Sequence, residues 1–398
     1  MSRLDFVVEK FSLNGCVRYV LSGNMHSPPF SASLYEAYLF ARGGGQRGSG
    51  RTIMQQLAYL FTWGNREGVD IDKLMLCGFG LNRVGVVSFG RWLKGLKDLR
   101  SGEPLSSDYI YQIFCSARKF AFWHVLRNMS GRKGNAAVLD TKDALEVLKI
   151  FWDVPFRVNG HDLEFSDFDM RCYSGIERHL YVDRNSSREN ISPQCFRDYL
   201  IWRIAWEFGL RIGEILALRL QDLYLFGSDP YLRVVRLDER DLSEYDPRGV
   251  YSPKVKTLSR DLGFIDKDSN LPDALEDYVS RFRCWSEIGG SRNLESVSHN
   301  YLFVSHGVGC LPLSYSAVRK LALKVSDALG MDFRWHMVRH TFFNKWYSEI
   351  PEGDKAAYES LRYWGGWKSE KSLNIYTRRA IRDAAVKGLI GFNRRASM

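Results

Sequence analysis

The hydrophobic residues in the first part of the chain follow two different periods. Apolar and polar residues alternate within residues 1–30, which predicts one or two short strands. From Ser31 onward, apolar residues recur at i, i+3, i+4 and i+7, as in amphipathic helices. Residues 31–130 are therefore expected to form a compact four-helix bundle. After a first helix from Ser31, its helices are expected at 52–68, 86–96 and 108–129.

The rest of the chain predicts a second domain. Residues 131–192 are less periodic and indicate a connector that contains one helix, at 142–152. Residues 193–398 begin with strongly helical sequence and then hold three short alternating runs within 220–266. We therefore expect an α+β domain, and a chain that is mainly α with a small antiparallel sheet. The later helices are expected at 272–288, 313–329, 336–349, 354–363, 369–376 and 379–391.

Composition narrows the possible partners. With 45% hydrophobic and 26% charged residues, the chain has the make-up of a folded protein and not of a disordered one. Its net charge of +10 favours a polyanionic partner, nucleic acid before membrane. The seven cysteines occur singly, which gives no readable metal site, and no apolar run approaches the length of a membrane span. We expect a cytoplasmic protein with reduced thiols.

Two motifs contain an arginine that could bind a phosphate group. In the first, Gly-Leu-Arg-Ile-Gly-Glu, Arg211 and Glu214 share one helical face, as either a structural ion pair or an anion clamp. In the second, His-Met-Val-Arg-His-Thr, His336 and Arg339 point the same way from a helix start, which suits a phosphate. His336 and His340 have a spacing that can bind zinc, but no Glu lies between them. For His340 alone, an internal hydrogen bond is the simpler interpretation.

Two further motifs carry basic and aromatic residues. A turn between two predicted strands holds Lys254, Lys256 and Arg260 and would ordinarily be solvated. A lysine on such a turn can also reach into a groove and donate a proton. Further on, Trp-Gly-Gly-Trp ends at Trp367, and Tyr376 follows nine residues later. By themselves, Trp367 suggests a core anchor and Tyr376 a half-buried helix residue.

Taken in order, these motifs resemble the tyrosine recombinase (phage integrase) family. The family has an arginine in a GLRxxE context, a hairpin lysine, an HxLRHT box, a His or Trp, and the nucleophilic tyrosine nine residues later. The resemblance covers residues 193–380, and the helical region 31–130 is similar to the family's SAM-like core-binding domain. Residues 1–30 match no module of the family.

The sequence departs from the family pattern in two places. Trp stands at 367, where His is commoner, and its indole N–H can still donate a hydrogen bond. A polar insertion at 238–249 precedes the lysine, so two assignments stay open. Lys256 is preferred because Lys-Thr resembles the family's hairpin, whereas Lys254 keeps the better distance to Arg260.

The resemblance implies that Tyr376 attacks a DNA phosphodiester and forms a 3′-phosphotyrosyl intermediate. The covalent link keeps the bond energy, so neither ATP nor a metal cofactor is expected. Arg211 and Arg339 would stabilise the transition state. The other implied roles are general base for His336, general acid for Lys256, hydrogen-bond donor to phosphate for Trp367, and supporting positions for Glu214 and His340.

The implied partner is duplex DNA with a specific target site, held between the helical and catalytic domains. A tetrameric synapse is expected, and the segment 376–398, with six basic residues and one acidic, either docks on a neighbouring subunit or folds back. Such a protein would be associated with the nucleoid. The sequence predicts a site-specific recombinase, more specifically an integrase of a mobile element. A type IB topoisomerase-like enzyme and a non-catalytic DNA-binding regulator are the alternatives.

Overall fold

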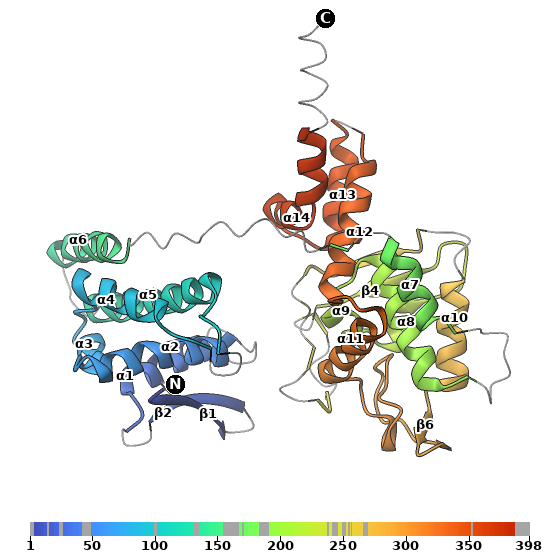
Figure 1. Cartoon of the computed structure of the whole chain (residues 1–398), viewed down its shortest axis with the longest axis horizontal. Helices are drawn as coiled ribbons and strands as arrows, with labels where there is room; N and C mark the ends of the chain where they lie inside the picture. The colour runs from blue at the N-terminus through green and yellow to red at the C-terminus, as the bar shows by residue number, and fades with distance from the viewer. Residues whose placement is uncertain are drawn as a thin grey trace, which may run out of the picture. The chain divides into compact units, whose positions relative to one another are not determined.

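The computed structural model divides into two compact units, residues 1–163 and 164–398, and each is described by itself (Figure 1). The described residues are 4–13, 16–23, 27–41, 49–98, 102–130, 135–153, 167–168, 171–182, 191–236, 239–240, 246–248, 252–253, 255, 257–265, 270–351 and 353–386. Within this part of the chain, every helix is too short or too polar to cross a lipid bilayer.

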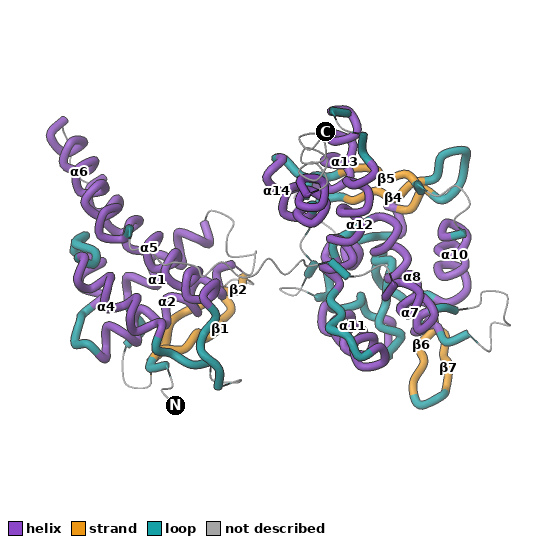
Figure 2. The backbone as a smooth tube through the Cα atoms, turned by 45° about the horizontal axis from the view of Figure 1, so that its top comes forward, coloured by secondary structure: helices purple, strands orange, loops and turns teal. Residues whose placement is uncertain are grey.

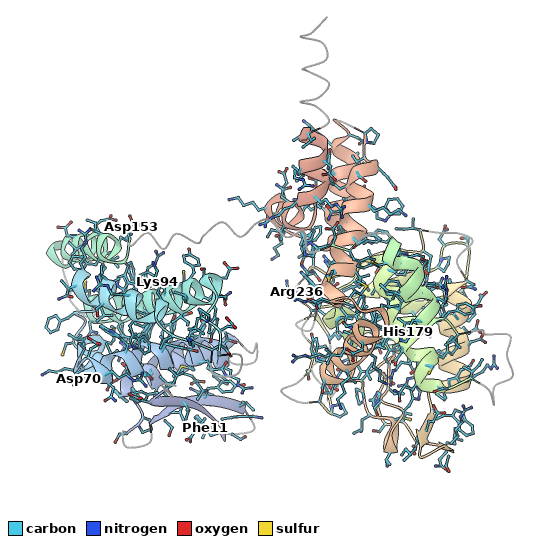
Figure 3. All side chains as sticks on the ribbon, viewed as in Figure 1. Phe11, Asp70, Lys94, Asp153, His179 and Arg236 are labelled. Carbon is cyan, nitrogen blue, oxygen red and sulfur yellow. The ribbon has the colours of Figure 1, made fainter. Side chains whose placement is uncertain are left out.

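The N-terminal unit is a helical bundle with a β-hairpin packed on it. Strands β1 (Phe6–Leu13) and β2 (Cys16–Gly23) pair in antiparallel register and pack against α2, so the strands predicted within 1–30 are confirmed. The described part of residues 31–130 holds one more helix than predicted, the six-residue α3, which is too short to show the full i, i+3, i+4, i+7 pattern. Asp70 caps its start (Figure 3). The helices are α1 (Phe30–Ala41), α2 (Ser49–Arg66), α3 (Ile71–Leu76), α4 (Arg83–Lys94), α5 (Ser107–Ser130) and α6 (Asn135–Trp152).

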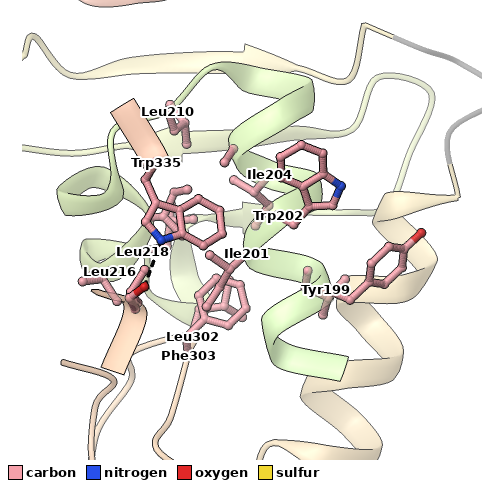
Figure 4. Close-up of a cluster of buried hydrophobic side chains, with 14 of the residues drawn as sticks. Tyr199, Ile201, Trp202, Ile204, Leu210, Leu216, Leu218, Leu302, Phe303 and Trp335 are labelled. Carbon is pink, nitrogen blue, oxygen red and sulfur yellow. Dashed lines mark hydrogen bonds between the residues drawn. The ribbon is translucent and has the colours of Figure 1, made fainter. Parts of the chain in front are cut away.

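The C-terminal unit is built around α8, which is buried along almost its whole length. Ser192 caps its start by accepting the Cys195 N–H, Pro193 occupies the first turn, and Gly209 ends it at φ 60°. Trp202 of α8 lies in the core with Trp335, whose indole N–H donates to the Val318 carbonyl (Figure 4). The helices are α7 (Arg171–Leu180), α8 (Pro193–Phe208), α9 (Ile212–Ala217), α10 (Leu271–Asp277), α11 (Tyr315–Leu329), α12 (Trp335–Glu349), α13 (Lys355–Gly365) and α14 (Glu370–Tyr376).

The predicted small antiparallel sheet is present, in the order β3-β4-β5. Its strands are β3 (Leu223–Tyr224), β4 (Tyr231–Val234) and β5 (Arg260–Gly263). Strand β5 lies against α13, which packs with α12 and α14 at one end of the unit (Figure 2). The sheet therefore connects the segment after the predicted lysine turn to the helices that carry the other motifs.

The predicted helix at 272–288 is wrong in its last part. Helix α10 continues as a π-helical turn over Tyr278–Phe282, and the chain then forms the hairpin of β6 (Trp285–Ile288) and β7 (Ser291–Leu294). Gly289 and Gly290 connect the strands with φ of 59° and 84°, which glycine adopts without strain. This Gly-Gly pair is a hairpin signal that the helical periodicity of the preceding residues obscures.

Two helix-ending glycines allow a matched stability test. Gly209 and Gly330 both adopt φ near 60°, but a Cβ at Gly209 would lie 2.5 Å from Cδ1 of Phe342, whereas a Cβ at Gly330 meets open space. We expect Gly330→Ala to cost about 1 kcal/mol, from the left-handed backbone alone. We expect Gly209→Ala to cost about 3 kcal/mol, because overpacking against Phe342 adds to that strain. Equal urea-unfolding free energies for the two variants would contradict this packing argument.

Candidate active site

The turn between α8 and α9 fixes the first arginine. Arg211 is the N-cap residue of α9, and its backbone N–H donates to the Glu214 carboxylate at 2.8 Å. Its side chain is free to extend, and Nη2 donates to the Tyr376 hydroxyl at 3.0 Å. Arg211 and Glu214 also form an ion pair, with 3.8 Å between Nη1 and Oε1. The pair therefore holds the guanidinium group of Arg211 in place beside the Tyr376 hydroxyl.

Glu214 is a fully buried carboxylate shared by three arginines. Its oxygens lie 3.3 Å from Arg260 Nη1, 3.6 Å from Arg339 Nη1 and 3.8 Å from Arg211 Nη1. The Thr257 hydroxyl also donates to it. Burial alone would raise the pKa of Glu214, but the three guanidinium groups lower it to about 2. Glu214 is thus an anion at neutral pH and holds the cations together.

Arg339 connects two distant turns of the chain. Its Nη1 donates to the Gly209 carbonyl at 2.7 Å and its Nη2 to the Gly365 carbonyl at 2.8 Å. The side chain has no exposed surface. Burial, together with the nearby charges of Arg211 and Arg260, lowers the pKa of Arg339 to about 9, and Glu214 opposes this shift. Arg339 consequently stays protonated at neutral pH.

Tyr376 lies at the end of α14, inside an aromatic cage. Its ring stacks on Trp367 at a centroid distance of 4.9 Å and an interplanar angle of 26°. The Arg339 guanidinium lies 5.0 Å from the ring centroid. Only 7% of the residue is exposed, and its hydroxyl is the atom that reaches Arg211. The cage therefore directs the phenol oxygen towards the arginines.

Two histidines of α12 complete the surroundings of this tyrosine. The ring centroids of His336 and His340 lie 5.3 Å and 4.6 Å from that of Tyr376. Burial is the main cause that lowers the pKa of both, to about 4 for His340, and His336 is lowered further by Arg339 and Arg211. Both imidazoles are therefore neutral near pH 7. Among the described residues, no cluster of His, Cys, Asp and Glu could hold a metal ion.

Trp367 follows a tight glycine turn at the end of α13. Gly366 has φ 66°, and a Cβ there would lie 2.7 Å from Arg260 Nη1 and from Thr257 Cβ. The Trp367 indole nitrogen is buried and has no hydrogen-bond partner within the described part of the chain. The same holds for Arg211 Nη1, Arg339 Nε and Arg260 Nη2. Buried donors of this kind can serve an anionic oxygen.

The site is open to a ligand from the side of α11. A hollow of about 570 Å³ is lined by Arg211, His336 and Arg339 on one side and by residues of α11, such as Tyr315 and Arg319, on the other. A group that enters this hollow meets Arg211 and the exposed edge of His336, and Arg339 lies buried directly behind the lining.

The structure brings most of the predicted site residues into one place. The predicted lysines Lys254 and Lys256 lie outside the described residues, and the choice between them stays a prediction. The residue next to Lys256, Thr257, is buried against Glu214. The predicted residues found together are Arg211, Glu214, His336, Arg339, His340, Trp367 and Tyr376.

Arg260 belongs to the site although the sequence predicts a solvated turn. That prediction is wrong for Arg260, which is 4% exposed and donates through Nε to the Trp364 carbonyl at 2.7 Å. It is buried because Glu214 neutralises it. The missed signal is strand alternation: Arg260 and Leu262 share the inward face of β5.

Replacing Glu214 should destabilise the protein in a pH-dependent way. Glu214→Gln leaves the buried guanidinium groups of Arg260 and Arg339, and the partly exposed one of Arg211, without their anion, and we expect a loss of about 3 kcal/mol at neutral pH. Because the folded pKa, about 2, lies below the ordinary value of 4.5, this stabilisation is present above pH 4.5 and is lost as the pH falls towards 2. The difference in unfolding free energy should therefore be smaller at about pH 3.5.

The matched control is Glu359→Gln. Glu359 pairs with Arg362 on the surface of α13, where it is 63% exposed, so its loss should cost no more than about 0.5 kcal/mol. Urea unfolding of both variants measures the contrast. Equal costs would show that Glu214 does not neutralise the arginines.

Comparison with known proteins bears on the fold. No model of a known protein family matches the chain. Transposase A from transposon Tn554 of Staphylococcus aureus is 28% identical over 204 residues, which are 50% of this chain and 49% of the transposase. The chain thus spans about half the length of the curated relatives it matches.

Solved structures match over more of the chain. The XerH site-specific recombinase, in its post-cleavage complex with a palindromic difH substrate, has a TM-score of 0.55 at 14% identity, covering 89% of this chain and 83% of that chain. The Tn1549 transposon integrase in complex with transposon right end DNA has a TM-score of 0.53 at 14% identity, covering 89% and 99%. The chain therefore has the fold of the tyrosine recombinases, the family that its motifs resemble.

Proposed function

We propose that this protein is a site-specific DNA recombinase that cleaves and rejoins duplex DNA through Tyr376. The observation that carries the proposal is the hydrogen bond of 3.0 Å between Arg211 Nη2 and the Tyr376 hydroxyl. This bond joins the hydroxyl of the predicted nucleophile to a guanidinium group 165 residues away in sequence, which supports the proposal. The related transposase and the recombinases of the same fold support this choice of reaction.

The charges of the site suit phosphoryl transfer. Arg211, Arg260 and Arg339 together with Glu214 give a net charge of +2 in a largely buried region. A phosphodiester carries one negative charge, and its pentavalent transition state gathers a second on the non-bridging oxygens. Positively charged donors that are already in place stabilise the transition state more than the ground state. The site is therefore matched to the reaction and not only to DNA binding.

The chemical step transfers one proton at each end. Tyr376 Oη attacks the phosphorus as its proton passes to neutral His336, and the bond from phosphorus to the 5′-oxygen breaks. The leaving oxygen takes a proton from the general acid, which we assign to Lys256. Trp367 donates to a non-bridging oxygen. A 5′-hydroxyl of a partner strand then reverses these steps and releases the tyrosine.

The intermediate determines what else the protein needs. Since the phosphotyrosyl bond stores the energy of the broken phosphodiester, strand joining requires neither nucleotide nor metal. Exchange between two duplexes needs four cleavages, which a tetramer on DNA supplies. We infer that the protein serves the integration of a mobile element and associates with the nucleoid through DNA. Helices of the N-terminal unit would add phosphate contacts.

Tyr376→Phe should abolish covalent capture of DNA. A nicked suicide substrate that carries the target site should trap wild-type protein as a covalent adduct, resolved by denaturing electrophoresis. Removing the hydroxyl removes the nucleophile, and DNA binding should change less than about threefold because phosphate contacts dominate affinity. Tyr363→Phe is the control, since Tyr363 is an exposed residue whose hydroxyl accepts the Asp261 N–H.

An adduct formed by Tyr376→Phe would rule out this nucleophile. Binding without any cleavage by the wild type would indicate a DNA-binding regulator. Relaxation of plasmids that lack any specific site would indicate a topoisomerase of the same fold.

The cleavage rate should depend on His336 below neutral pH. As a general base His336 must be neutral, and because its pKa is lowered, the acid limb of the rate profile should lie below pH 6.5. His336→Gln should slow adduct formation about 100-fold and remove that limb. His179→Gln, an exposed histidine of α7 (Figure 3), should leave the profile unchanged. An unaltered acid limb in His336→Gln would assign the base to another group.

A further inference from the structure

The predicted nucleophile lies at a break between two helical segments. Helix α14 ends at Tyr376, Thr377 leaves the helical conformation at φ −110° and ψ 15°, and residues 378–386 are helical again. Thr377 is fully buried, and its hydroxyl donates to the Leu373 carbonyl. The position of Tyr376 therefore depends on how both segments are held, and not on α14 alone.

Within the described residues, two side-chain hydrogen bonds connect the second segment to other parts of the C-terminal unit. The Ala380 N–H donates to Oδ1 of Asn344 on α12 at 3.1 Å. Arg379 Nη1 donates to Oδ2 of Asp167 at 3.2 Å, across a sequence separation of 212 residues. Asp383 lies further away, 3.9 Å from Arg379 Nε. Among the described carboxylates that pair with Arg379, the nearer one thus comes from a segment remote in sequence.

The backbone next to Asp167 is anchored in the core of the C-terminal unit. It lies at the start of the C-terminal unit, and its side chain is 5% exposed. The next residue, Phe168, is buried; its N–H donates to the Thr341 hydroxyl of α12, and its ring stacks near Trp206. The second oxygen of Asp167 is buried and has no hydrogen-bond partner among the described residues. A carboxylate fixed in this way attracts a cation strongly.

We propose that Asp167 is a positioning residue for Tyr376: by binding Arg379 it holds the segment after the nucleophile against α12. This inference rests on the proposed function, and it assigns a role to residues outside the reacting groups. The first residues of the C-terminal unit thereby take part in aligning the phenol with Arg211.

This role differs from a contribution to stability. Arg379 is 42% exposed, so removing its charge should change the global unfolding free energy little. A displacement of the tyrosine by about 1 Å can cost as much as 100-fold in rate. The proposal therefore predicts a large effect on cleavage with a small effect on folding and on DNA affinity.

The test compares four variants in single-turnover cleavage of the nicked suicide substrate at saturating DNA. Arg379→Gln and Asp167→Asn should each slow cleavage by about 10- to 100-fold with DNA affinity changed less than threefold. The double variant should be no slower than the slower single one, because both changes remove the same pair. Arg379→Lys keeps the charge and should cleave within about threefold of wild type.

Arg382→Gln is the matched control. Arg382 belongs to the same helical segment, is 56% exposed and pairs with Asp383. It should cleave like wild type. Rates for Arg379→Gln that equal those of Arg382→Gln, or additive losses in the double variant, would overturn the proposal.

Hydrogen exchange of residues 370–386 in the free full-length protein provides a readout that needs no activity. Arg379→Gln should speed exchange in this segment at least about threefold relative to Arg382→Gln, because its attachment to α12 is loosened. Equal exchange in the two variants would overturn the proposal. Faster exchange in a protein that never cleaves DNA would support the positioning contact and refute the proposed function.

Discussion

The buried carboxylate of Glu214 is the interaction on which the rest of the site depends. Three guanidinium groups lie within 4 Å of the Glu214 carboxylate. Without this anion they would repel one another in a region of low dielectric, so Glu214 makes their close approach possible. Each arginine also reaches a different part of the chain: Arg211 the tyrosine, Arg339 the carbonyls of two turns, and Arg260 the end of α13. One residue of α9 therefore joins a sheet, three helices and the predicted nucleophile.

The same arrangement relates charge to function. A net charge of +10 suggests a polyanion, but it does not distinguish binding from catalysis. The distinction comes from burial. Exposed cations are screened by salt, whereas Arg339 has no exposed surface and acts over short distances inside the protein. Buried donors such as Trp367 Nε1 add direction, since they can interact only with a group that enters the site.

The sequence predicts helices, which depend on local periodicity, and site residues that belong to motifs. The helices of the α12 to α14 region follow from periodicity. The candidates Arg211, Arg339 and Tyr376 follow from motifs whose order and spacing resemble those of the recombinase family. What it misses depends on distant partners. Arg260 resembles a solvated residue until Glu214 is known to lie beside it, and the β6–β7 hairpin follows a segment whose period is helical. The contact between Asp167 and Arg379 spans 212 residues and leaves no pattern in the chain.

Helix α12 has a consequence for how such proteins can diverge. Its successive turns present His336, Arg339, Thr341 and Asn344 to four different neighbours, namely the tyrosine ring, the glycine carbonyls, Phe168 and Ala380. One inserted or deleted residue would rotate everything beyond it by about 100°. Point substitutions can accumulate along this helix, but changes in its length cannot. Related chains should vary in their loops and insertions while this stretch keeps its residue count.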